Sequence, residues 1–357
     1  MKKMIQYELR KIFGRRLTQV SLLAVLLLSA LFSASTYLNK FALEGDTQAS
    51  GGEAVALDKA IAARYAGKLT DEKVLAMLDD LAPKTGPEGL NRIYLYQNAM
   101  QSAVTARFSD ADGNWNGLHV TDAFGEEEIH IGYVDGWLCA SQDMTKVYVC
   151  LSFVILLMIS PVYCGEYGGV DRLILSSRYG RTKCATAKAL AGILATLLAT
   201  AATAAVNLGA GFLLYGPEGL DCSILFAPLT LTEGYIPFNI TCGTLLGYQV
   251  LLAFTGTIGI AGVALLCSAV CRNPLTAMAA TGAVHILPIL LPVAESSSLF
   301  RLLALTPLYQ VQFVSLMSVE QMKGGMLYAC LALPVSAALA AIGFFSSRKI
   351  FSNHQVT

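Results

Sequence analysis

The sequence predicts an all-α membrane protein with about six transmembrane helices, an N-terminal amphipathic interfacial helix and a small helical extracytoplasmic domain. Of its 357 residues, 55% are hydrophobic and only 14% are charged, whereas soluble chains average about 25% charged residues. The hydrophobic residues gather in long runs, and a helix needs ~20 apolar residues to cross a bilayer. Lysine and arginine cluster beside particular ends of these runs, as they do in proteins whose membrane helices they orient.

Residues 1–16 predict the interfacial helix. Ile5, Leu9, Ile12 and Phe13 fall on one face at helical spacing, and basic residues occupy most of the remaining surface. Such a helix lies in the headgroup layer with its cations toward anionic lipids. The plainer interpretation is a basic anchor that only fixes the topology of the first span.

Six apolar stretches predict the spans, at residues 17–38, 147–163, 189–215, 245–271, 275–293 and 326–345. The first is longer than the ~7–15 residues of a signal-peptide core, so we interpret it as a retained span. Alanine, glycine and threonine dominate 189–215 and 245–271, and small residues let helices approach closely in lipid. We therefore expect these two helices inside the bundle.

The charged residues orient the chain with both termini in the cytoplasm, which we expect for a multi-pass protein of a bacterial cytoplasmic (inner) membrane. Basic residues at span ends lie mostly in the segments that this orientation places inside, which are 1–16, 164–188, 272–274 and 346–357. Most acidic residues lie in the segments placed outside, which are 39–146, 216–244 and 294–325. This asymmetry follows the positive-inside rule and agrees with an even number of spans.

None of the six predicted spans contains Asp, Glu, Lys or Arg. Ion-coupled carriers usually need an ionisable residue near the middle of the membrane, and His285 is the candidate of that kind. A polar residue that packs between helices is the plainer interpretation of His285, and a catalytic residue of an intramembrane enzyme would need partners that His285 alone does not supply. We therefore expect the energy source to lie outside the spans.

The long insertion at 39–146 predicts the helical extracytoplasmic domain, since it is too large for a simple connection. Apolar residues at helical spacing predict helices around 57–65, over 70–81 and over 90–108. The region after Ser109 is rich in Gly, Asp and Asn and predicts a loop.

Part of that loop resembles the first half of a calcium-binding loop, with Asp112, Asn114 and Asn116 at alternate positions. The twelfth position needs a bidentate Glu, and it is Ala123 here. We therefore expect a turn and no metal site.

Cys222 and Cys242 lie in one predicted outer loop, 216–244. In an oxidising compartment they could form a disulfide if their geometry allows it.

The predicted cytoplasmic loop 164–188 carries a distinctive order of residues. A short amphipathic helix over 169–177 would lie parallel to the membrane and dock Leu173 and Ile174 against a surface, while Arg172 and Arg178 point to solvent or a partner. The elements of the pattern are Glu166, Gly169, Arg172, Leu175-Ser176, Arg181 and Ala187-Lys188.

This order resembles the cytoplasmic loop of ABC-2 type transporter permeases, the membrane-spanning subunits of ABC exporters. The resemblance extends to the amphipathic start, the six-span layout and the large outer insertion. It implies that Glu166, Gly169, Arg172 and Arg181 belong to a coupling loop, whose short helix docks on a separate ABC ATPase subunit. It also implies short re-entrant helices in 294–325 and a second permease copy or paralogue in a dimer.

On this resemblance the function is ATP-driven export of an amphipathic substrate, such as a lipid, a peptide or a drug, by alternating access. The chain has no phosphate-binding loop of the GxxxxGK[ST] type, so we expect a transport subunit and no enzyme, with ATP and Mg on the partner ATPase and no cofactor in this chain. The expected partners are the ATPase, the second permease copy and membrane lipids. The net charge of zero does not favour nucleic acid.

A membrane sensor or accessory protein is the alternative function. In that case residues 39–146 would bind a ligand, and the protein would need no ATPase.

Overall fold

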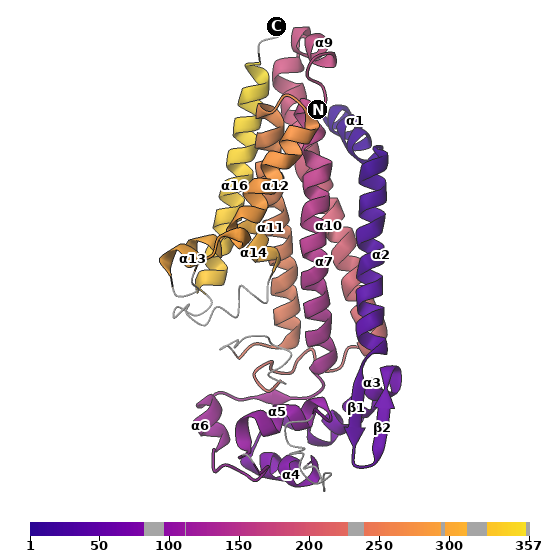
Figure 1. The fold of residues 1–357 in the computed structure, drawn as a ribbon, viewed down its shortest axis with the longest axis vertical. Coiled ribbons are helices and arrows are strands. Elements are labelled where there is room, and N and C mark those ends of the chain that lie inside the picture. The colour runs from indigo at the N-terminus through magenta and orange to yellow at the C-terminus, as the bar shows by residue number, and fades with distance from the viewer. Residues whose placement is uncertain (82–95, 111, 228–238, 294–296, 313–326, 355–357) are drawn as a thin grey trace.

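The computed structural model describes residues 1–81, 96–110, 112–227, 239–293, 297–312 and 327–354. These residues form a predominantly helical protein with little sheet, as the sequence predicts. Figure 1 shows a bundle of long helices with both chain termini at one end, which we call the termini end. The described residues of 39–134, which we call the inter-span domain, lie at the opposite end.

Within the described residues, five helical stretches are long and apolar enough to cross a membrane. They are α2 (Arg16–Leu38), α7 (Asp135–Ile159) with its continuation α8 (Pro161–Cys164), η2 (Gly180–Cys184) with α10 (Ala185–Tyr215), α11 (Cys242–Val270), and the Cys330–Ser352 part of α16 (Leu327–Ser352). A shorter apolar helix, α12 (Pro274–Leu290), lies beside them. The chain is therefore a membrane-embedded helical protein.

One face of α2 is unpartnered and apolar. Val20, Leu23, Leu27 and Leu31 recur at helical spacing and are all exposed. In water such a stripe would be costly, whereas lipid tails cover it at no cost. This exposure shows that α2 lies at the periphery of the bundle.

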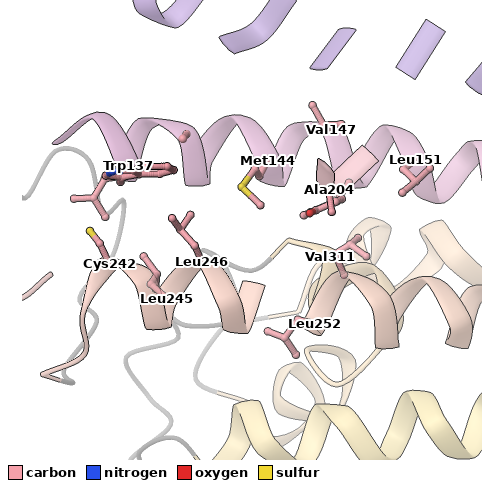
Figure 2. Close-up of a cluster of buried hydrophobic side chains, with 14 of the residues drawn as sticks. Trp137, Met144, Val147, Leu151, Ala204, Cys242, Leu245, Leu246, Leu252 and Val311 are labelled. Atoms are coloured by element: carbon pink, nitrogen blue, oxygen red, sulfur yellow. The ribbon is translucent and has the colours of Figure 1, made fainter. Parts of the chain in front are cut away.

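By contrast, α11 lies at the centre of the packing and contacts α7, α10, α12 and α16. Small residues make the closest approach possible, because the backbones of Gly262 on α11 and Gly343 on α16 are in direct contact. Figure 2 shows the apolar cluster between α7 and α11. Trp137 and Met144 extend from α7, and Leu245 and Leu246 extend from α11.

The helix α7 begins at Asp135, well before the apolar run expected from residue 147. Its first turns are stabilised by packing, since the Trp137 ring lies against Gly211 of α10. The helix therefore contains Asp143 and Lys146, which form an ion pair of 3.0 Å. The expectation that the spans carry no charged residue holds for 147–163 and does not hold for this longer helix.

Two short helices, α13 (Ser298–Leu303) and α14 (Pro307–Val311), precede α16. The second packs against α11, where Gly256 leaves room for the Pro307 carbonyl. Gln310 of α14 is buried and hydrogen-bonds Ser336 Oγ of α16 at 2.9 Å. Part of the predicted re-entrant segment 294–325 is thus packed among the long helices, and residues 294–296 and 313–326 lie outside the described residues.

The inter-span domain contains four described helices, α3 (Gly51–Tyr65), α4 (Asp71–Leu81), α5 (Ala99–Phe108) and α6 (Val120–Phe124). It also contains two small antiparallel sheets that the sequence did not indicate, β1 (Phe41–Glu44) with β2 (Thr47–Ser50) and β3 (Gly67–Lys68) with β4 (His130–Ile131). The first is a tight hairpin that pairs Phe41 with Ser50 and Glu44 with Thr47. The predicted helix over 90–108 is α5 in its second half, and residues 82–95 lie outside the described residues.

Substitution of Gly262 tests the contact between α11 and α16. An alanine Cβ at this position would lie 2.5 Å from the Leu339 carbonyl oxygen and 2.6 Å from the Ala340 Cα. We expect Gly262→Ala to destabilise the protein by about 1–3 kcal/mol, the usual cost of overpacking, in thermal unfolding of the detergent-solubilised chain.

Gly247→Ala on the same helix is the matched control, because no atom lies within 4 Å of its Cβ position. Here alanine improves helix propensity and should leave stability unchanged or raise it by roughly 0.5–1 kcal/mol. Equal effects of the two substitutions would contradict the close contact.

Candidate functional site

Four charged side chains meet near the termini end of the bundle and form what we call the four-charge cluster. Glu8 and Lys11 come from α1 (Lys2–Phe13), Glu166 follows α8, and Lys188 lies in the second turn of α10. The Lys188 ammonium is 2.6 Å from Glu166 Oε1 and 3.0 Å from Glu8 Oε1. Lys11 pairs with the same Glu166 oxygen and lies 3.5 Å from Glu8.

Burial sets the strength of this arrangement. Lys188 has 0% of its surface exposed, and Glu8 and Glu166 are also buried. A charge in such a place is tolerated only when it is paired, and removing one member leaves the others uncompensated. Burial alone would lower the pKa of Lys11, but its hydrogen bond and charge interaction with Glu166 raise that pKa above its ordinary value, so Lys11 stays protonated.

The segment that carries Glu166 is fixed by hydrogen bonds to neighbouring spans. The Tyr163 hydroxyl donates to the Ala185 carbonyl of α10 at 2.9 Å, and the Tyr167 hydroxyl donates to the Ala269 carbonyl of α11 at 2.8 Å. Arg15 adds a link from the other side, because its guanidinium donates to the carbonyls of Met158 and Pro161. Glu166 is therefore held in place between α10, α11 and the start of α2.

The apolar face predicted for residues 1–16 turns toward the protein. Ile12 is buried, and Ile5, Leu9 and Phe13 are partly buried against the same core. The helix α1 contacts α10 and α2. Glu8 lies between Ile5 and Ile12 on this buried face and Lys11 lies beside it, so the face of α1 that packs on the bundle also supplies the cluster.

Beyond Glu166, the chain forms α9 (Val170–Ser176), which Figure 1 shows at the extreme termini end. It begins after Gly169, whose φ of −160° and ψ of −81° are neither helical nor extended. Leu175 is buried and fixes the helix to the protein, while Leu173 is 75% exposed and Val170 is 54% exposed. This exposed apolar pair on a short helix is the most protruding feature of the loop.

After α9 the chain makes a turn that only glycine fits. A Cβ on Gly180 would overlap the Ile174 carbonyl oxygen. Arg181 follows and donates to the Ser352 carbonyl of α16 at 2.8 Å. The loop is thereby joined to the C-terminal helix as well as to α1 and α10.

The structure therefore separates the four predicted coupling residues. Glu166 lies inside the four-charge cluster, Gly169 precedes α9, and Arg172 is exposed on α9. Arg181 contacts the end of α16. The sequence did not predict that Glu166 joins a cluster with Glu8, Lys11 and Lys188. The one feature of the sequence that could have indicated it is Lys188 itself, because a lysine inside an alanine-rich helix needs a carboxylate partner.

A cavity of about 380 Å³ opens between α1 and α9. Its walls combine the apolar Met4 and Ile174 with the charged Lys3 and Glu8. Such a groove can accept an apolar side chain with a charged neighbour from a partner protein.

At the other end of the bundle, Cys222 and Cys242 lie on adjacent backbone segments. The Cys242 N–H donates to the Cys222 carbonyl at 2.9 Å, next to a bridge between Ser223 and Thr241. Both thiols are buried, and no disulfide joins them. Burial, with the nearby Asp221 charge, raises the pKa of Cys222 to about 11, so the thiol is protonated at neutral pH.

Fold and site together define a helical membrane protein whose termini end holds a buried ion cluster and a protruding amphipathic loop. The chain matches no protein-family model, no curated protein and no solved structure.

Replacement of Lys188 tests the four-charge cluster. Lys188→Met removes the ammonium and leaves two buried carboxylates that pair with Lys11, so we expect a loss of about 3–5 kcal/mol of stability in detergent unfolding experiments.

Lys2→Met is the control, since Lys2 is exposed on α1 and surface substitutions usually change stability by less than ~0.5 kcal/mol. A Lys188→Met protein as stable as the Lys2→Met protein would rule out a structural role for the cluster.

Proposed function

We propose that this chain is the membrane-spanning permease subunit of an ATP-driven ABC-2 type exporter. The observation that carries the proposal is the junction at the termini end, where a buried ion cluster fixes a loop whose short helix α9 exposes Leu173 and Val170. A helix that is firmly attached at its base and apolar at its tip is suited to dock on another protein and transmit force. The residue order from Glu166 to Lys188, which resembles the coupling loop of these permeases, agrees with this use.

The surface around α9 indicates the partner's chemistry. Arg172 and Arg178 are exposed beside Leu173, and Lys183 lies over the Tyr179 ring at 4.1 Å. A complementary surface has an apolar pocket for Leu173 and an acidic rim, since opposite charges steer and orient association. We assign this surface to a separate ABC ATPase subunit that binds ATP and Mg.

The four-charge cluster gives the docking surface a connection to the spans. A displacement of α9 by the ATPase would act on α10 through the contact of Glu166 with Lys188, and on α1 through the contact of Glu166 with Lys11. Nucleotide would then shift the population between inward- and outward-facing arrangements of the bundle. Export of an amphipathic substrate, a lipid, a peptide or a drug, follows from the same resemblance.

The proposed topology has six spans, with α12 as the additional one. Its 17 residues are at the short end of the ~17–25 that can cross a bilayer. An even number of spans agrees with the position of both termini at one end of the bundle (Figure 1). We place that end in the cytoplasm of a bacterial inner membrane and the inter-span domain outside, with a second copy or a paralogue completing a dimer.

Leu173→Asp is the sharpest test of the docking role, because Leu173 is mostly exposed and its replacement should leave the fold intact. We expect a pull-down of the tagged wild-type chain in mild detergent to recover an ATPase with Walker motifs. Recovery should fall about tenfold or more with Leu173→Asp, as for a central interface residue.

Leu75→Asp on α4 is the matched control, as Leu75 is an exposed leucine of the inter-span domain and should leave recovery unchanged. Recovery of the wild-type chain alone, without ATPase activity, would contradict the permease function.

A sensor or accessory protein is the second candidate function, and one observation favours it. A cavity of about 600 Å³ opens on the inter-span domain between α3 and the segment around residue 132. Lys59 pairs with Glu218 at 3.0 Å at its edge and lies over the Tyr133 ring. The volume of this cavity lies in the range of small-molecule sites. A ligand found in the cavity, together with no ATPase in the pull-down, would support the sensor function.

A further inference from the structure

A second buried charged cluster lies at the opposite end of the bundle, where the inter-span domain meets the spans. Lys40 follows α2, Asp135 is the first residue of α7, and Asp58 lies on α3. Lys40 and Asp135 form a buried ion pair. Asp58 has only 2% of its surface exposed, so all three groups are removed from solvent.

The charges of this junction do not balance. The junction holds the carboxylates of Asp58 and Asp135 and one ammonium, that of Lys40. This ammonium is already paired with Asp135. Asp58 Oδ1 accepts a hydrogen bond from the Ala99 N–H at 3.2 Å. Asp58 Oδ2 and Asp135 Oδ1 are buried and have no hydrogen-bond partner in the part of the chain that the structure describes.

Both carboxylates line the same small cavity, of about 10 Å³. That volume is about what one water molecule needs and excludes a larger ligand. An ionised carboxylate in such surroundings would carry a large desolvation cost, and buried acids avoid that cost by taking up a proton.

We propose that Asp58 binds a proton at this junction and that the bound proton attaches the inter-span domain to α7, so that the contact responds to the pH on that side of the membrane. The protonated Oδ2 of Asp58 donates to Asp135 Oδ1, directly or through one water in the cavity. Loss of the proton places a second negative charge beside Asp135 and weakens the contact between α3 and α7. This inference does not depend on the proposed transport function.

The electrostatic surroundings support this assignment. Burial and then the charge of Asp135 raise the pKa of Asp58 to about 7, against the smaller opposite effects of the Ala99 N–H and of Lys40. The other titratable groups around the carboxyl are Asp135 and Cys139 on α7, Lys40 after α2, and Tyr96 and Tyr133. Lys, Tyr and Cys ordinarily titrate above about pH 8, so between about pH 4 and pH 8 a proton bound at this junction belongs to its carboxylates, of which Asp135 is paired with Lys40.

The direction of the pH effect follows from linkage. The folded protein keeps the Asp58 proton up to about pH 7, whereas the unfolded chain releases it near the ordinary value of 3.8. The folded state therefore binds more protons between these limits, and its stability decreases as the pH rises through them.

The test compares wild type with Asp58→Asn in detergent, by thermal unfolding at about pH 5 and about pH 8. Asparagine imitates the protonated acid, since it keeps an acceptor for the Ala99 N–H and supplies a donor toward Asp135. The wild-type melting temperature should fall by several degrees between the two pH values. Asp58→Asn should remove most of that fall and melt higher than wild type at the upper pH.

Asp79→Asn, at an exposed aspartate of α4, is the matched control and should follow wild type. Infrared spectra of the wild-type protein near pH 6 give an independent readout, because a protonated carboxyl has its own carbonyl band and Asp58→Asn should lose it. This second measurement needs only the folded wild-type protein to detect the acid.

Parallel pH profiles for wild type and Asp58→Asn, or the lack of a protonated carboxyl band in the wild-type spectrum, would overturn the proposal. So would a wild-type protein whose melting temperature at the upper pH rises with added Na⁺ or Ca²⁺, because the junction would then hold a cation in place of the proton.

Discussion

Lys188 is a fully buried ammonium in a helix built largely of alanine, glycine and threonine, and the packing of the termini end depends on how its charge is compensated. Neither neighbouring turns of α10 nor lipid can supply a carboxylate. Glu8 must come from α1 and Glu166 from the segment after α8. The position of α1, the course of the loop and the location of α9 therefore follow from one requirement, that no charge is left unpaired in an apolar interior.

The sequence is informative where structure depends on local patterns. Runs of apolar residues identify the long helices, and the abundance of small residues in 245–271 anticipates the central place of α11. Helical spacing likewise locates α4 and the C-terminal part of α3, because burial of one face of a helix leaves a period that can be read along the chain. The predominantly helical, membrane-embedded character of the protein is confirmed on this basis.

What could not be predicted depends on contacts between distant residues. Glu166 stands out in the sequence as one element of a loop, but its partners Lys11 and Lys188 are chosen only when α1 folds back onto α10. The same holds for Lys40, Asp58 and Asp135, which come from three separate segments of the chain. The early start of α7 at Asp135 is also a tertiary effect, since Trp137 finds its place against Gly211 of another helix.

The continuity of α7 joins these two ends of the molecule. Its 25 residues give a rod about 37 Å long at 1.5 Å per residue, with Asp135 at one tip and the α8 segment before Glu166 at the other. A straight helix is stiff along its axis, so a shift or rotation at either tip is shared by both. The junction around Asp135 and the four-charge cluster thus lie at the two ends of one continuous helical segment, which joins the inter-span domain to the α9 loop.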